Sequence, residues 1–211
     1  AEGVAEPGVR EAMLRDLDEM DAMLDEVLDF LSRELREEEV KTVDLGALLQ
    51  SICDDYADLG APVSYADPPP LTFHAAGTLF APPPSSGPVQ VFDHERKVRL
   101  ACRPVALRRA IANLIDNALK YGRCAAVRLD AGAEQVRIAV EDQGPGIPPE
   151  EMEKVFLPLY RIESSRQRST GGTGLGLAIV RSAIAAHRGQ VELRNREAGG
   201  LCVLVTLPRE A

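Results

Sequence analysis

Apolar residues in the first forty positions recur at the spacing of an α-helix. They follow one another at intervals of four and three residues, at Met13, Leu17, Met20, Leu24, Val27 and Leu31. This regular alternation forms one stripe on a helix and is typical of helices that pair in a bundle or a dimer. The alternative is an amphipathic helix that covers its own domain. The pattern predicts a helix over residues 9–38 and favours pairing, because no return helix follows within the chain.

Helical and strand patterns then follow one another without a strict β-α-β repeat. Helical spacing covers residues 44–60, 104–121 and 175–187, with Asp44 placed to cap the first of these helices. Alternating apolar and polar residues predict strands at 61–67, 125–130 and 135–142, strands around a turn at 89–101 and a β-hairpin at 190–208. Residues 67–88 hold seven of the fifteen prolines and are predicted as a loop. This mixture predicts an α/β sandwich with a mixed or largely antiparallel sheet.

The net charge of −9 is unevenly distributed along the 211 residues. Residues 1–39 carry 14 acidic and 4 basic residues, whereas the remainder is nearly balanced with 19 acidic and 20 basic ones. Neither part has the basic patch of a nucleic-acid-binding protein. The sequence also contains no signal peptide and no apolar run of membrane length, so we expect no membrane contact by this chain.

The four cysteines lie far apart in the sequence, at positions 53, 102, 124 and 202, and no C-x-x-C pair is present. This usage indicates reduced thiols in a cytosolic protein rather than a disulfide framework or a zinc site.

Four glycines crowd the start of the last predicted helix, in the stretch TGGTGLGLAIV (170–180). Glycine weakens a helix interior, so this much bare backbone needs a reason. One reading is a flexible loop end or close packing against a neighbour. The other is a phosphate site, because free N–H groups and the dipole at a helix start favour anions. No Lys follows as in a Walker A loop, and Ile179 replaces the third glycine of the dinucleotide motif, so neither common motif fits.

The predicted helix at 104–121 carries a polar stripe separate from its apolar face. Asn113, Asn117, Lys120 and Tyr121 form this stripe. Asparagine is a mediocre helix former, so two of them four residues apart are unusual, although a solvated face would also accept them. An Asn carbonyl is a hard ligand suited to Mg²⁺, which takes few protein ligands and shares the phosphates of its nucleotide. Lys120 adds a positive charge, and Tyr121 offers a flat surface for a base.

The predicted strand at 135–142 ends in Glu141-Asp142 and breaks at Gly144-Pro145-Gly146. An ordinary turn is one reading. In the functional reading, a carboxylate at the strand end accepts a hydrogen bond from an exocyclic amine such as that of adenine. The neighbouring glycines let a purine approach the backbone, and Ile147 contributes an apolar wall.

Apolar residues and arginines share the segment VFLPLYRIESSRQRST (155–170). The apolar residues anchor one end of a loop, while Arg161, Arg166 and Arg168 can reach anionic oxygens. A solvated basic loop is the alternative for Arg166 and the preferred reading for Arg168.

Together, in this order and at this spacing, the four segments resemble the N, G1, F and G2 boxes of the sensor histidine kinases of two-component systems. The boxes here are NLIDNALKYG (113–122), EDQGPGIP (141–148), FLPLYR (156–161) and GGTGLGLAIV (171–180), and the likeness extends over residues 43–208. Each box alone is common, whereas the set is specific. The resemblance implies the Bergerat ATP-binding fold, a two-layer α/β sandwich in which helices cover one face of a mixed sheet, here preceded by a long N-terminal helix.

The resemblance also implies that ATP and Mg²⁺ are the cofactors. Among the catalytic candidates, Asn117 would hold the metal, Asn113 would support the phosphate site, and Lys120 and Arg161 would touch phosphates. Asp142 would read the adenine amino group. The remaining nucleotide-binding candidates would flank the base or lie along the triphosphate: Tyr121, Gly144, Gly146, Ile147, Gly172, Thr173, Gly174, Leu175 and Gly176.

The N-terminal helix resembles the second helix of the dimerisation and phosphoacceptor hairpin of these kinases. The first helix, which carries the phosphoacceptor histidine, has no counterpart, and His74, His94 and His187 all lack its sequence context. We therefore expect residues 1–39 to be part of the hairpin and residues 40–211 to be the ATP-binding catalytic domain. We also expect the chain to be the cytoplasmic, C-terminal part of a longer kinase anchored in the inner membrane.

The expected reaction is transfer of the ATP γ-phosphoryl group to a histidine that is not on this chain. The expected partners are the phosphoacceptor helix, a response regulator and a second copy bound through the N-terminal helix. One alternative is a Bergerat-fold ATPase like those of DNA gyrase B, mismatch repair and heat-shock chaperones. Those enzymes place a Glu where Asn113 stands to activate water, and an amide cannot accept that proton. The other alternative is a non-catalytic nucleotide-sensing or dimerisation module, which the missing histidine favours.

Overall fold

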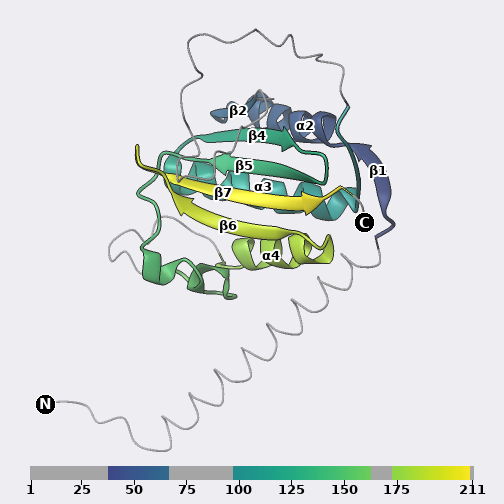
Figure 1. The fold of residues 1–211 in the computed structure, drawn as a ribbon. Helices are drawn as coiled ribbons and strands as arrows, with labels where there is room; N and C mark the ends of the chain where they lie inside the picture. Colours follow the sequence, from purple (N-terminus) through teal and green to yellow (C-terminus); the bar gives the residue numbers. More distant parts are fainter. Residues whose placement is uncertain (1–37, 67–96, 163–172, 210–211) are drawn as a thin grey trace, which may run out of the picture.

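The computed structural model describes residues 38–66, 97–162 and 173–209 (Figure 1). The predicted helix at 9–38 apart from Glu38, the proline-rich loop at 67–88 and the first part of the predicted strands at 89–101 lie outside the described residues. The same holds for Arg166, Arg168, His74, His94 and Gly172.

Five strands form one mixed sheet in the order β2-β4-β5-β7-β6 (Figure 1). Only β2 and β4 are parallel; the other neighbours are antiparallel. The mixed sheet predicted from the sequence is therefore confirmed. The strands are β2 (Val63–Ala66), β4 (Ala125–Ala131), β5 (Gln135–Glu141), β6 (Gln190–Asn195) and β7 (Leu201–Pro208).

Three helices pack on one face of this sheet: α2 (Leu45–Asp58), α3 (Pro104–Gly122) and α4 (Gly176–Ala186) (Figure 1). Strand alternation explains the two layers, because successive side chains point to opposite faces. On β4, Val127 joins the core beneath the helices, whereas the next residue, Arg128, points to the outer face and pairs there with Glu141. The two-layer α/β sandwich is confirmed.

Local sequence signals set the helix ends. Asp44 caps α2 as predicted, since its carboxylate accepts a hydrogen bond from the backbone N–H of Ala47 at 3.3 Å. Pro104 begins α3, where its missing N–H would have no helical partner in any case. Helix α2 ends two residues before Gly60, which has a φ of +78°.

Three short elements add to the predicted set. Strand β1 (Lys41–Asp44) pairs antiparallel with β3 (Arg99–Cys102) in a separate two-stranded sheet. Two 3-10 helices, Pro149–Glu151 and Lys154–Phe156, lie in the connection after β5, where no helix or strand is predicted from the sequence. Each of these elements has only three or four residues, too few for a hydrophobic period to appear.

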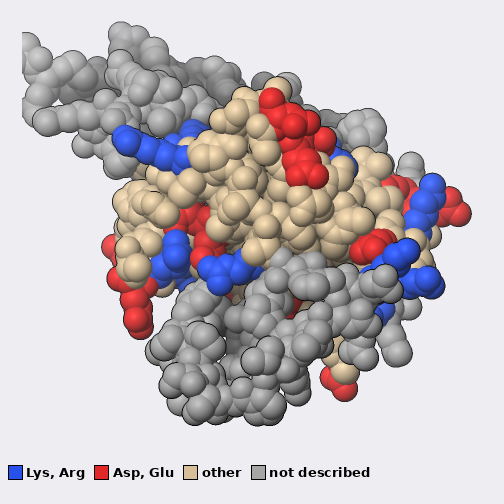
Figure 2. Space-filling view, turned by 90° about the horizontal axis from the view of Figure 1, so that it is seen from above, with Lys and Arg blue, Asp and Glu red and all other residues tan. Residues whose placement is uncertain are grey.

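Charged side chains lie in separate small groups on the face shown in Figure 2, with basic and acidic residues near one another. In the described part of the chain, no helix has the length and apolar content needed to cross a membrane.

Burial raises the pKa of the Cys53, Cys102 and Cys202 thiols to about 11, so these cysteines stay protonated at neutral pH.

The start of α3 is capped by a residue from a distant part of the sequence. The Glu38 carboxylate accepts hydrogen bonds from the backbone N–H groups of Val105 at 2.7 Å and Ala106 at 2.9 Å. Arg103, the residue before the helix, donates from its side chain to the carbonyls of Glu38 and Ala186. Its backbone N–H donates to Nε2 of His187 at 2.9 Å. These contacts join the first described residue to the start of α3 and the end of α4.

Replacing this cap should destabilise the fold. We expect Glu38→Ala to lower the free energy of unfolding by about 1 kcal/mol, because two helix N–H groups lose their acceptor. Urea unfolding curves measure the change. The matched control is Glu39→Ala: its side chain is 82% exposed and 3.8 Å from Lys41, so its effect should stay below about 0.5 kcal/mol. Equal losses in the two variants would show that Glu38 contributes no cap.

Candidate functional site

The amide stripe of α3 and the glycines before α4 meet in the structure. Gly176 is the first residue of α4, and a Cβ built on it would lie 3.6 Å from Nδ2 of Asn117. The same position is 3.9 Å from Oδ1 of Asn113 and from Oδ1 of Asn117. The structure therefore brings together two segments that are about sixty residues apart in the sequence, as the resemblance implied.

Asn113 presents an unsatisfied donor at this meeting point. Its Nδ2 atom is buried and has no hydrogen-bond partner among the residues that the structure describes. An unpaired buried amide N–H is costly, so such a group calls for a partner that arrives with a ligand. A phosphate oxygen is the matching acceptor.

The start of α4 adds further donors. Leu175 occupies its N-cap position and makes no side-chain cap hydrogen bond. The first N–H groups of a helix have no intrahelical partner, and the helix dipole favours negative charge there. Beside the Asn113 and Asn117 amides, this end of α4 is suited to a phosphate chain. Thr173, two residues earlier, is exposed.

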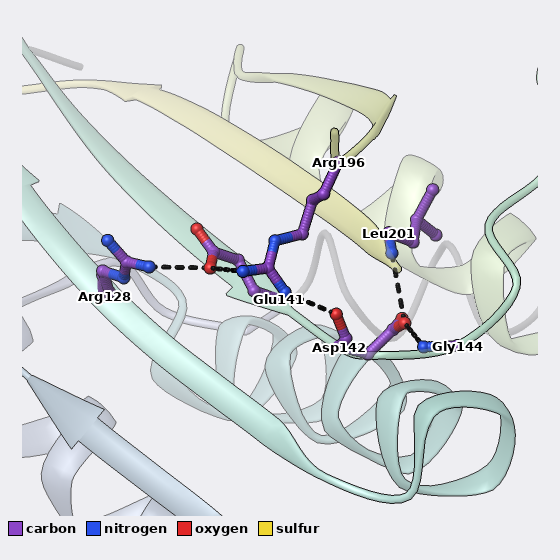
Figure 3. A network of polar contacts seen from close by, with 6 residues as sticks. All are labelled: Arg128, Glu141, Asp142, Gly144, Arg196 and Leu201. Carbon is purple, nitrogen blue, oxygen red and sulfur yellow. Dashed lines mark hydrogen bonds and ion pairs between the residues drawn. The ribbon is translucent and has the colours of Figure 1, made fainter. Parts of the chain in front are cut away.

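Asp142 follows β5 and is nearly buried, with 7% of its surface exposed. Its Oδ1 atom accepts from the backbone N–H of Gly144 at 2.7 Å and of Leu201 at 3.1 Å (Figure 3). Within the described residues no hydrogen bond reaches Oδ2. One oxygen therefore orients the carboxylate and the other is left for a ligand that donates, such as the amino group of a base.

The end of α3 lies directly against Asp142. A Cβ built on Gly122 would be 2.7 Å from Cγ of Asp142, and one on Gly144 would be 2.8 Å from the carbonyl oxygen of Tyr121. Only glycine permits these approaches, which bring the helix end and the Asp142 turn together. Tyr121 is half exposed, and Nζ of Lys120 lies 4.9 Å from its ring centre.

The segment after the Asp142 turn has a buried anchor and an exposed end. Val155 and Phe156 are buried, whereas Leu157 and Leu159 are exposed. The backbone of Leu159 lies against Gly174, since a Cβ there would be 2.7 Å from the Leu159 carbonyl carbon. Arg161 is exposed near the end of the described segment. The F box therefore borders the glycines before α4.

The Tyr160 hydroxyl donates to the Glu151 carboxylate in the same segment. This hydrogen bond, followed by that from Lys154, lowers the pKa of Glu151. The hydrogen bond between Tyr160 and Glu151 joins the end of this segment to its first 3-10 helix.

Sequence reasoning predicted the turn between β6 and β7 but missed its contacts with the site. Asn195 pairs with the backbone of Ile147. Arg196 donates to the carbonyl of Asp142 at 2.7 Å (Figure 3). The stretch NREAGG (195–200) signals a turn, but no local pattern reveals a partner about fifty residues away.

The residues present fit a magnesium nucleotide better than a metal held by the protein alone. Within the described ranges no group of three His, Cys, Asp or Glu side chains is placed to hold a metal ion. Asn117 beside the start of α4 carries one amide oxygen that a magnesium ion could use as a ligand, and Mg²⁺ commonly takes its other ligands from phosphates and water.

The protein belongs to the two-layer α/β class of ATP-binding proteins. Its site combines the buried Asp142 carboxylate, the amides of Asn113 and Asn117 and the start of α4, which has no side-chain cap. Residues 102–211 match the family described as histidine kinase-, DNA gyrase B- and HSP90-like ATPase, and the chain belongs to this family. Within it, the chain carries the ATP-binding catalytic domain of the sensor histidine kinases, which confirms the resemblance seen in the sequence.

Two relatives illustrate the likeness in sequence. The sensor histidine kinase GtrS of Pseudomonas aeruginosa is 35% identical over 201 residues, which are 95% of this chain and 36% of GtrS. The sensor histidine kinase CpxA of Escherichia coli is 43% identical over 109 residues, which are 50% of this chain and 23% of CpxA. The chain thus spans about a third or less of the length of these relatives.

Solved structures share the fold. The catalytic domain of the histidine kinase ThkA superimposes with a TM-score of 0.58 at 21% identity, over 81% of this chain and 96% of that domain. The histidine kinase domain of the Escherichia coli osmosensor EnvZ gives a TM-score of 0.54 at 27% identity, over 82% of this chain and 90% of that domain.

The contact between Gly122 and Asp142 makes a direct prediction. We expect Gly122→Ala to lower the free energy of unfolding by about 1–3 kcal/mol, because the new methyl group overlaps Asp142. The nucleotide affinity should fall with it, since Asp142 must move. Urea unfolding and calorimetric titration with Mg·ADP measure the two effects.

The matched control is Gly46→Ala in α2. The nearest atoms to a Cβ there are 3.5 Å away, and Ala favours a helix over Gly by about 1 kcal/mol. This control should be neutral or stabilising. A Gly122→Ala protein as stable as the control would contradict the close approach of α3 to Asp142.

Proposed function

We propose that this chain binds Mg·ATP between the end of α3, the Asp142 turn and the start of α4, and delivers the γ-phosphoryl group to a histidine on a separate helix. The observation that carries this proposal is the Asn113 side chain at the start of α4: its Oδ1 atom lies 3.9 Å from a Cβ built on Gly176, and its buried Nδ2 atom has no hydrogen-bond partner among the described residues. Among the described residues, Asn113 and the start of α4 therefore offer donors that suit phosphate oxygens.

Asp142 would recognise the base. Its Oδ1 atom is already held by two backbone N–H groups, so the free Oδ2 atom has a fixed direction. An exocyclic amino group donates to this oxygen, whereas a carbonyl at the same place would face a negative charge. The site would thereby select adenine. Tyr121 and Ile147 would flank the base, and Gly144 and Gly146 would let it approach the backbone.

Asn113, Asn117 and the start of α4 would hold the phosphates. Asn117 would ligate Mg²⁺ through its amide oxygen, and Asn113 would donate to a phosphate oxygen. When bound, the metal supplies positive charge that stabilises the transferring phosphoryl group. Lys120 and Arg161 would add charge at the phosphates. Backbone N–H groups just before and at the start of α4 would lie along the chain of phosphates. They belong to Gly172, Thr173, Gly174, Leu175 and Gly176.

Transfer is favoured over hydrolysis by the chemistry of Asn113. An amide cannot accept a proton from water, so no side chain at this position activates water as a base. Phosphoryl transfer depends mostly on positioning and on charge stabilisation, both of which this arrangement supports.

The partners follow from the same proposal. Residues 1–39 would form a helix of the dimerisation and phosphoacceptor hairpin and pair with a second copy, and the phosphoryl group would pass on to a response regulator. The sensor part, the membrane anchor and the cytoplasmic site of the reaction also belong to the proposal, which the greater length of the relatives supports.

Nucleotide binding is the first test. We expect the chain to bind Mg·ADP and Mg·ATP, and Asp142→Asn to weaken binding by roughly 1.5–3 kcal/mol, because a charged hydrogen-bond acceptor is lost. Calorimetric titration measures the affinity. Chelation of Mg²⁺ should weaken binding of both nucleotides. Unchanged affinity in the Asp142→Asn protein would refute the role given to Asp142.

Phosphoryl transfer is the second test. We expect γ-labelled ATP to leave this chain unlabelled and to label a separately supplied phosphoacceptor hairpin of a sensor histidine kinase. The label should be stable to alkali and labile to acid. Asn117→Ala should abolish the labelling. Release of free phosphate without labelling would indicate the ATPase instead, and nucleotide binding without either reaction would indicate a nucleotide-sensing module.

A further inference from the structure

The turn between β6 and β7 contacts both ends of the loop that follows β5. Asn195 makes a two-way pair with Ile147: its Oδ1 accepts from the Ile147 N–H at 2.8 Å, and its Nδ2 donates to the Ile147 carbonyl at 2.7 Å. Arg196 donates through Nη1 to the carbonyl of Asp142 at 2.7 Å. The turn therefore fixes the backbone of the loop at Asp142, its first residue, and at Ile147, near its end.

The Arg196 side chain is held in place by Glu141, the last residue of β5. Its Nη2 atom lies 3.4 Å from Oε2 of Glu141, and Nη2 of Arg128 lies 2.7 Å from the same oxygen (Figure 3). The Glu141 side chain is only 2% exposed. A buried carboxylate is costly unless it is paired, and both arginines pair with Oε2 here, whereas Oε1 has no hydrogen-bond partner among the described residues. The guanidinium group thus has a defined orientation when it reaches Asp142.

The backbone of the turn is built for this approach. Gly200 has a φ of +97°, and a Cβ built on it would lie 2.8 Å from the carbonyl carbon of Asp142. Any side chain at this position would push the turn away from Asp142. Next to it, the backbone N–H of Asp142 donates to the carbonyl of Leu201 at 2.9 Å.

We propose that Arg196 and Asn195 are positioning residues that set the base specificity of the nucleotide site. Arg196 fixes the main chain of Asp142, and Asn195 fixes that of Ile147, so that the free oxygen of Asp142 points where an adenine amino group arrives. The inference rests on the proposed function, because it assumes that Asp142 reads the base.

Base selection is the property that such positioning would control. Adenine donates from its amino group, whereas hypoxanthine carries a carbonyl oxygen at the same place and gains nothing from Asp142. A loosened Asp142 should therefore lose affinity for adenine nucleotides and little for hypoxanthine nucleotides. General damage to the fold would lower both affinities together.

The test compares binding of ADP and inosine diphosphate, each with Mg²⁺, by calorimetry. We expect Arg196→Gln to weaken ADP binding by about tenfold, in line with the loss of one charged hydrogen bond, and to leave inosine diphosphate nearly unchanged. The preference for ADP should fall by the same factor. A preference that stays at the wild-type value would overturn the proposal.

The matched control is Arg194→Gln. Arg194 lies two residues earlier, on β6, its side chain is 47% exposed, and it pairs with the exposed Glu192. This variant removes the same charge from the same region and should bind both nucleotides as the wild type does. An equal loss of ADP preference in this control would show that net charge, not the contact to Asp142, is responsible.

Three further variants keep the test decisive if Arg196→Gln folds poorly. Arg196→Lys retains a charge for Glu141 but cannot bridge Glu141 and Asp142 together, so it should also lose ADP preference. Asn195→Ala should reduce ADP preference through Ile147. In Asp142→Asn, adding Arg196→Gln should have little further effect on ADP binding, because both changes act on one carboxylate. Additive losses would overturn the proposal.

The proposed function and the positioning role of Arg196 and Asn195 are contradicted by different results. If the wild-type chain binds neither nucleotide, the proposed function is wrong. If it binds ADP, prefers ADP to inosine diphosphate and loses that preference in Asp142→Asn but not in the Arg196 and Asn195 variants, the proposed function stands and the positioning role is wrong.

Discussion

The close approach of three backbone segments around Asp142 is the constraint on which the site depends. The end of α3 comes up to the carboxylate at Gly122, the loop after β5 turns away at Gly144, and the turn after β6 closes in at Gly200. At each of these places a side chain would collide with Asp142 or its neighbour. A buried carboxylate is stable there because backbone N–H groups satisfy one of its oxygens.

The same approach joins the base end of the site to the phosphate end. Helix α3 ends at Gly122, which lies against Asp142. Asn117 and Asn113, five and nine residues before this end, lie near the start of α4. A single rigid helix therefore sets the separation between the carboxylate and the amides. This arrangement explains why one stretch of sequence, from Asn113 to Gly122, contains so many of the candidate residues.

Much of this was predictable from the sequence, because the signals are local. Helical spacing and the Asp44 cap predicted α2, and strand alternation predicted β4 and β5 within one or two residues. Contacts between distant segments were not predictable. Asn195 and Arg196 look like ordinary turn residues, and Glu38 is the middle of a run of three glutamates that looks solvent-exposed, yet each bonds to backbone groups roughly fifty or more residues away.

The Glu38 and Arg103 contacts have a mechanical consequence. Helices α3 and α4 are rods of about 28 Å and 16 Å, and Glu38 and Arg103 bind together the two ends that lie away from the candidate phosphate residues. A rotation of the chain before Glu38 would act on both helices at the Glu38 and Arg103 contacts. Because a helix moves as a rigid unit, a small tilt at these contacts would become a larger sideways displacement at the opposite helix ends, where Asn117 and Gly176 lie.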